Sequence, residues 1–163
     1  MQFEVAAAAG AGLIGGLAMV VPLYMGRAMM PAKMRMDLLL LLGTMVPAPV
    51  SRAMAYGLGG MMHAGASIAF AFAHVGVFVA ADIDSDFAAW GLLFGAVHWA
   101  LSGMALGVLP VLHPLVRTGE LENPGPFATG MGPLTAMGFL VLHLLFGVVV
   151  AVFYDAFTVL PFS

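Results

Sequence analysis

Long apolar runs dominate the chain, and short polar connections separate them. Four runs reach the length of about 20 residues that a helix needs to cross a bilayer, at residues 5–25, 53–81, 87–112 and 133–157. The alternation of apolar and polar residues that marks a membrane β-strand is absent. The pattern predicts an all-α, polytopic membrane protein, a four-transmembrane-helix bundle that forms a single transmembrane domain over residues 1–163.

A fifth apolar run, residues 36–46, is only about half as long as a membrane-crossing helix must be. It ends at Pro47-Ala-Pro49, which no helix continues through. The pattern predicts a short interfacial or re-entrant segment in the first loop. An amphipathic anchor and a docking element are alternative interpretations.

Composition excludes several classes of protein. Hydrophobic residues make up 63% of the chain and charged residues 8%, against about 25% charged in a typical soluble domain. The net charge of -3 and its scatter give no footprint for nucleic acid. Because cysteine is absent, disulfides, thiolate metal sites and thiol catalysis are excluded.

The charged residues divide between the two sides of the predicted membrane. With four spans, all the basic residues fall on one side, namely Arg27, Lys33, Arg35, Arg52 and Arg117. The opposite side carries only acidic residues, namely Glu4, Asp82, Asp84, Asp86 and Asp155. Since basic loops stay in the cytoplasm, we expect a bacterial cytoplasmic (inner) membrane protein with both termini on the outer, periplasmic side.

Aromatic residues near the span ends agree with this orientation. Tyr24 and Tyr56 fall at the cytoplasmic end, and Trp90 and Tyr154 at the outer end. Aromatic rings favour the level of the lipid headgroups, so we expect an inner belt and an outer belt.

Small residues inside the spans indicate close helix packing. Helices in lipid associate through glycine pairs spaced as GxxxG, and the chain has three such pairs: Gly12 with Gly16, Gly91 with Gly95, and Gly103 with Gly107. We expect these glycines to lie at helix interfaces.

Four histidines lie deep in the predicted spans, where Asp, Glu, Lys and Arg are absent: His63, His74, His98 and His143. An ionisable residue inside a membrane marks a candidate functional site. At about 1.5 Å per residue, His98 and His143 fall near the midplane and His63 and His74 on either side of it, so the four are expected to converge. The alternative is structural, with each ring donating one hydrogen bond across a helix interface.

Three cofactors suit such histidines. Haem b takes imidazole from both sides of the iron, and glycines beside the ligand admit a flat ring; the neighbouring glycines are Gly60, Gly65, Gly76 and Gly95. A chlorophyll-type pigment needs one axial histidine. Copper suits imidazole and thioether together, which adds Met61 and Met62 beside His63 as candidate metal ligands.

No catalytic pattern accompanies the histidines. The sequence has no GxSxG or HExxH motif and no phosphate-binding glycine loop. We therefore expect a non-catalytic membrane subunit or accessory protein, embedded in the lipid bilayer and packed against other membrane subunits, plausibly in an energy-converting complex. The alternative is a histidine-ligated haem, pigment or copper protein that acts in electron transfer or metal handling.

Several stretches resemble a family of small four-span bacterial membrane proteins of unknown function. The resembling stretches are Ala11 to Met19, Gly59-Gly-Met-Met-His63, Gly91-Leu-Leu-Phe-Gly95 leading to Leu109-Pro110, and Leu142-His143-Leu-Leu-Phe-Gly147 ending at Val152-Phe-Tyr154. The resemblance implies a four-span fold and no known activity. It also implies that His63 and His143 are the histidines most worth testing.

Overall fold

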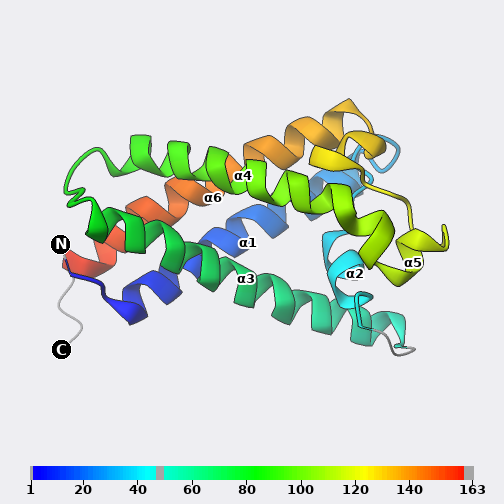
Figure 1. The fold of residues 1–163 in the computed structure, drawn as a ribbon, viewed down its shortest axis with the longest axis horizontal. Helices are drawn as coiled ribbons and strands as arrows, with labels where there is room; N and C mark the ends of the chain where they lie inside the picture. Colours follow the sequence, from blue (N-terminus) through cyan, green and yellow to red (C-terminus); the bar gives the residue numbers. More distant parts are fainter. Residues whose placement is uncertain (1, 47–49, 160–163) are drawn as a thin grey trace. The chain divides into compact units, whose positions relative to one another are not determined.

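The computed structural model describes residues 2–46 and 50–159, and this part of the chain is helical without strands (Figure 1). Its elements in order are α1 (Val5–Met29), α2 (Leu38–Gly43), α3 (Arg52–Ala80), α4 (Phe87–Leu112), α5 (Pro114–Arg117), the 3-10 helix η1 (Pro126–Met131) and α6 (Pro133–Val159). The predicted Pro47-Ala-Pro49 break lies outside the described residues.

Four helices, α1, α3, α4 and α6, are long and apolar enough to cross a membrane. Each begins and ends within four residues of a predicted span. The predictions of an all-helical fold and of four candidate spans are therefore confirmed. Pro133 occupies the first position of α6, where its missing N–H leaves no bond unmade.

The chain folds into two compact units, and each of the four long helices contributes to both. Unit 1 comprises Met1–Pro22, Ala64–His98 and Val141–Ser163, and unit 2 comprises Leu23–His63 and Trp99–Leu140.

Unit 1 is built on close contacts between helix backbones. A Cβ added at Gly91 or Gly95 of α4 would lie 2.6 Å from a backbone oxygen of α6, and one added at Gly12 of α1 would lie 2.8 Å from the backbone oxygen of Ser67 on α3. Only glycine permits such an approach. Three of the predicted packing glycines thus lie at helix contacts, and Gly16 is also buried.

The second unit packs the short elements against the long helices. Leu41 of α2, Leu109 of α4 and Val116 of α5 form one buried apolar cluster. A second cluster joins Met36 to Ala128 and Met131 of η1.

The predicted half-length segment corresponds to α2, and none of its six residues is exposed. Its backbone lies directly on α3: the carbonyl group of Leu39 occupies the space beside Gly59, and that of Ala55 the space beside Gly43. Within unit 2, α2 is therefore packed against other parts of the protein. Such packing allows a helix too short to cross the membrane to keep its backbone polar groups hydrogen-bonded.

The residues nearest to Gly103 and Gly107 belong to η1. The ring of Phe127 lies against Gly103, and Pro126 lies against Gly107. Phe127 and Ala128 both have positive φ angles, of 54° and 60°, a conformation that costs energy in residues other than glycine. The ring of Phe127 also packs on Trp99, with centroids 4.7 Å apart.

Candidate functional site

Three of the four predicted intramembrane histidines come together in unit 1. His74 lies on α3, His98 on α4 and His143 on α6. The ring centroids of His74 and His98 are 6.0 Å apart, and those of His98 and His143 are 4.7 Å apart; both pairs are edge-on. We call these three residues the histidine cluster.

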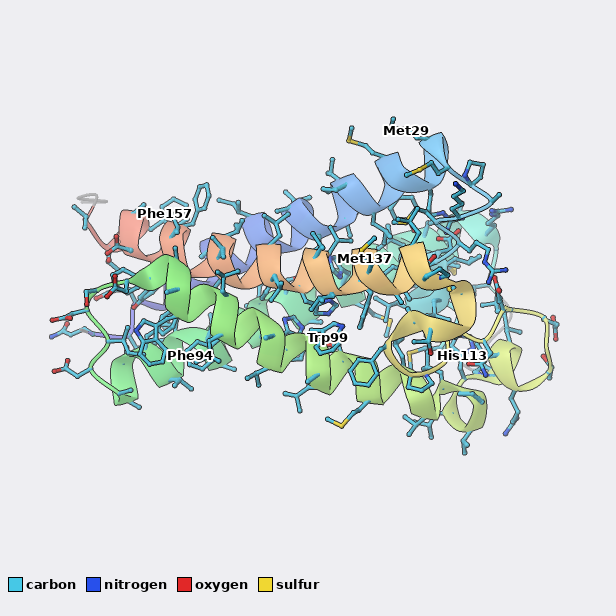
Figure 2. The ribbon with its side chains drawn as sticks, turned by 90° about the horizontal axis from the view of Figure 1, so that it is seen from above. Met29, Phe94, Trp99, His113, Met137 and Phe157 are labelled. Atoms are coloured by element: carbon cyan, nitrogen blue, oxygen red, sulfur yellow. The ribbon has the colours of Figure 1, made fainter. Side chains whose placement is uncertain are left out.

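Phenylalanine rings enclose the histidine cluster. Phe70 stacks on His98 with a centroid distance of 3.6 Å, and Phe146 packs edge-on against His98 at 5.0 Å and against His74 at 5.7 Å. Phe94, which Figure 2 labels on α4, packs against His74 at 5.6 Å. The immediate surroundings of the imidazoles are thus aromatic and apolar.

All three imidazoles are buried. His74 is 4% exposed, His98 6% and His143 5%. Residues 5–22, 64–80, 87–98 and 141–154 of unit 1 contain no Asp, Glu, Lys or Arg. An ionised group in such surroundings has no partner of opposite charge, so the neutral imidazole is the form that suits them.

The hydrogen bonding of the His74 ring is incomplete. The Nδ1 atom of His74 is buried and makes no hydrogen bond with any residue the structure describes. Buried polar atoms are nearly always bonded, and each exception needs an explanation.

The close approach of α4 and α6 places two of the rings side by side. A Cβ on Gly95 would lie 2.6 Å from the backbone oxygen of His143 and 2.9 Å from the Cα atom of Leu144. Gly95 stands three residues before His98, on the same side of α4. The backbone of α6 therefore occupies the space beside Gly95, where a flat cofactor was predicted to fit.

The fourth predicted histidine, His63, belongs to unit 2, and its side chain is half-buried. Its predicted metal-binding neighbours Met61 and Met62 are 67% and 38% exposed. A Cβ on Gly60, Gly65 or Gly76 would meet nothing within 4 Å. These glycines face away from the packed interior and do not border the histidine cluster.

A haem held between His98 and His143 does not fit the cluster as the side chains lie. Two axial imidazoles bind iron at about 2 Å on opposite faces of a macrocycle, which requires a flat, empty layer between them. Between His98 and His143 the centroid distance is 4.7 Å, and Phe70 covers a face of His98. Among the described residues, no group of three or more His, Asp or Glu side chains is placed to hold a metal ion.

His113, which Figure 2 labels, is completely buried in unit 2. Its Nδ1 atom accepts the backbone N–H of Val116 and so caps the start of α5, while Nε2 lies 2.9 Å from the backbone oxygen of Leu41 and 3.3 Å from Oγ1 of Thr44. One imidazole thus joins the ends of two short helices. Its place next to Pro114 was the only sequence signal for this helix-capping role.

Asp37 anchors the start of α2 in unit 2. Its carboxylate accepts 2.6 Å hydrogen bonds from the hydroxyl groups of Tyr24 and Tyr56, caps the N–H of Leu40, and pairs with Arg27 at 3.1 Å. Burial alone would raise the pKa of Asp37, but the two tyrosine hydroxyls and the Arg27 guanidinium outweigh it and lower that pKa below its usual value. The two tyrosines predicted for an inner belt thus have a specific polar partner.

Arg35 holds the loop before α6 in unit 2. Its guanidinium donates to the backbone oxygens of Gly130 and Met131 and pairs with Glu122 at 2.9 Å. Its backbone N–H donates to the hydroxyl of Thr135. Sequence reasoning treated Arg35 only as part of the cytoplasmic charge.

The fold and the site define an all-helical chain with four helices suited to a membrane and a buried histidine cluster. Comparisons of the chain with protein families, with curated proteins and with solved structures found no match. The family resemblance and its implied interest in His63 and His143 therefore stay predictions.

Proposed function

We propose that this chain is a multi-pass protein of the bacterial inner membrane and a non-catalytic subunit of a larger membrane complex, plausibly an energy-converting one. The observation that carries the proposal is a helix face on α3 that is lined by small residues and is exposed in the part of the chain that the structure describes. The orientation, the partners and the termini on the periplasmic side are parts of the same proposal.

The distribution of charge over the two units supports the orientation. All five basic residues belong to unit 2, and no Lys or Arg belongs to unit 1. Unit 1 instead carries Glu4, Asp82, Asp84, Asp86 and Asp155. By the positive-inside rule, unit 2 is the cytoplasmic half.

The exposed face of α3 differs from that of α4. In unit 1 the exposed residues of α3 are mostly small: Gly65, Ala66, Ala69, Ala73, Val77 and Ala80. Over the same unit α4 exposes Ala88, Ala89 and Trp90 in its first turn, and beyond it Leu92, Leu93 and Val97, each about half exposed. Large aliphatic side chains suit lipid, whereas small ones let another helix backbone approach closely.

The remaining glycines of α3 extend this contrast. Among the described residues, nothing lies within 4 Å of a Cβ placed on Gly65 or Gly76, whereas the space beside Gly91 and Gly95 of α4 is filled by α6. Gly91 and Gly95 thus serve packing within the chain, while the small residues on the outer face of α3 are left for a partner. We infer that a transmembrane helix of another subunit packs there.

The test is to replace one small residue on this face by a large one. Ala69→Leu is expected to release the chain from its complex, because the added side chain blocks close approach of a partner helix. Ala105→Leu makes the same change at an exposed position of α4 and serves as the matched control. Both variants are compared with the wild type by native gel electrophoresis of membranes dissolved in mild detergent.

The wild type and Ala105→Leu are each expected to migrate as an assembly larger than the single chain. Ala69→Leu is expected to migrate as the single chain. If the wild type migrates as a single chain, or if Ala69→Leu stays in the assembly, the proposed face is not a subunit interface.

A further inference from the structure

The first residue of α3, Arg52, carries a positive charge that no acidic side chain of the described residues contacts. Two other arginines of unit 2 are paired, Arg27 with Asp37 at 3.1 Å and Arg35 with Glu122 at 2.9 Å. The side chain of Arg52 is exposed. Its charge is therefore available to a group from outside the chain.

Tyr56, one turn further along α3, holds the Arg52 guanidinium in place. The hydroxyl of Tyr56 donates to Asp37 at 2.6 Å and accepts from Nη2 of Arg52 at 3.4 Å. The guanidinium carbon also lies 5.8 Å from the centroid of the Tyr56 ring. A guanidinium that is already oriented loses less freedom when it binds, and its planar fork matches the oxygens of a phosphate group.

The charges around Asp37 leave an excess of one positive charge. Arg27 pairs with the carboxylate directly, and the same carboxylate attracts Arg52 and is linked to it by the Tyr56 hydroxyl. Two guanidinium groups thus share one carboxylate. A ligand with a single negative charge, such as a phosphodiester, complements this group.

The position of Arg52 along α3 indicates where such a phosphodiester comes from. In the proposed orientation, the first turn of α3 lies at the cytoplasmic surface of the membrane. The lipids of that leaflet include anionic phospholipids, which attract Lys and Arg close to the surface. The ring of Tyr56 also suits the level of the headgroups.

The helix face that continues from Arg52 into the membrane has no long side chains. It comprises Ala53, Gly57 and Gly60, whose spacing places them on one side of α3. Among the described residues, nothing lies within 4 Å of a Cβ placed on Gly57 or Gly60. An acyl chain can therefore lie directly against the helix below the headgroup.

We propose that Arg52 binds the phosphate of one anionic phospholipid of the cytoplasmic leaflet, with an acyl chain along Ala53, Gly57 and Gly60. This site rests on the membrane location and orientation in the proposed function. It does not depend on the proposed subunit partner, which packs on the part of α3 in unit 1, whereas these residues belong to unit 2.

The test is native mass spectrometry of the purified full chain in mild detergent. The wild type is titrated with phosphatidylglycerol and with phosphatidylcholine of the same acyl chains, and inorganic phosphate is added in excess in a parallel series. We expect one molecule of phosphatidylglycerol to bind more tightly than phosphatidylcholine. Inorganic phosphate is expected not to displace it, because free phosphate lacks the acyl chains.

Substitutions identify the basic residue that binds. Arg52→Gln is expected to weaken phosphatidylglycerol binding by more than the about fivefold that one basic residue contributes at an anionic membrane surface. Arg117→Gln removes the same charge from another exposed arginine of unit 2. This matched control is expected to change the affinity by less than about fivefold.

Equal affinity of the wild type for the two lipids, or displacement of phosphatidylglycerol by inorganic phosphate, would overturn the proposal. Equal losses in Arg52→Gln and Arg117→Gln would overturn it too, because they would show a diffuse attraction without a site. Circular dichroism checks that each variant is folded, and if Arg52→Gln is not, the comparison of the two lipids on the wild type decides. Since the isolated chain is used, failure of this site and failure of the subunit interface are measured separately.

Discussion

The contact between α4 and α6 through Gly95 can be tested by adding a single methyl group. In Gly95→Ala the new Cβ would lie 2.6 Å from the backbone oxygen of His143, whereas carbon and oxygen atoms in such contacts are normally about 3.3 Å apart or more. The two helices must separate by about 0.7 Å at this point. The nearest atoms, the backbone oxygen of His143 and the Cα atom of Leu144, both belong to the backbone of α6, so this backbone itself has to shift.

The expected cost follows from two opposing effects. Overpacking a tight interface destabilises a protein by about 1–3 kcal/mol, while alanine stabilises a helix by about 1 kcal/mol relative to glycine. We expect Gly95→Ala to lower the free energy of unfolding by up to about 2 kcal/mol. Gly76→Ala is the matched control: a Cβ on Gly76 meets nothing within 4 Å, so this variant keeps or gains stability.

Unfolding by SDS in mixed micelles, followed by circular dichroism, measures both variants in the same background. The reasoning fails if Gly95→Ala is as stable as the wild type, or if Gly76→Ala loses as much stability as Gly95→Ala. The two substitutions are chemically identical, so the difference between them isolates the contact with α6.

Three further predictions concern unit 2. His113→Leu leaves the backbone oxygen of Leu41 without its imidazole partner and is expected to cost about 1–3 kcal/mol, measured by the same SDS titration. Because folding lowers the pKa of Asp37, its carboxylate stabilises the protein above the unfolded pKa of about 3.9, and this contribution disappears as the pH falls through the lower folded pKa. Asp37→Asn should remove this loss of stability at acid pH. The same loss in Asp37→Asn would show that another group causes it. Arg35→Ala frees the oxygens of Gly130 and Met131 and should speed hydrogen exchange in η1, an effect that unaltered exchange would disprove.

The four long helices were predictable because the length of an apolar run directly determines whether a helix can cross a bilayer. The half-length run around α2 was predictable for the same reason. Its docking on α3 was not, because it depends on Gly43 and Gly59 facing particular backbone groups. Such contacts arise from the rotation of each helix, and hydrophobicity alone leaves that rotation open.

The histidine cluster could be predicted only in part. Depth along the helices placed the histidines in the interior, and the structure brings His74, His98 and His143 into one cluster. His63 was expected to converge with the other three, but it belongs to unit 2 and its side chain is only half-buried. The neighbours of α3 differ between the units, with α2 beside Gly59 in unit 2, so two histidines of one helix need not have the same surroundings.

The specific hydrogen bonds of tyrosines near the span ends were not predicted. Aromatic residues there are generally explained by the lipid headgroups, and basic residues by the orientation in the membrane. Tyr154, expected in an outer belt, is completely buried; its hydroxyl donates to the backbone oxygen of Gln2 and accepts the N–H of Glu4. Tyr24 and Tyr56 bind Asp37 in the same specific way. Belt composition does not distinguish a ring that lies at the headgroups from one whose hydroxyl joins two segments.

The proposal of four membrane crossings with unit 2 in the cytoplasm is tested most directly by labelling single cysteines. The chain has no cysteine, so Lys33→Cys, Arg117→Cys and Asp84→Cys each carry one reactive thiol. In intact spheroplasts a maleimide that cannot cross the membrane should label Asp84→Cys alone, and all three variants after the membrane is opened. Labelling of only one of Lys33→Cys and Arg117→Cys from outside would place them on opposite sides and contradict the four crossings.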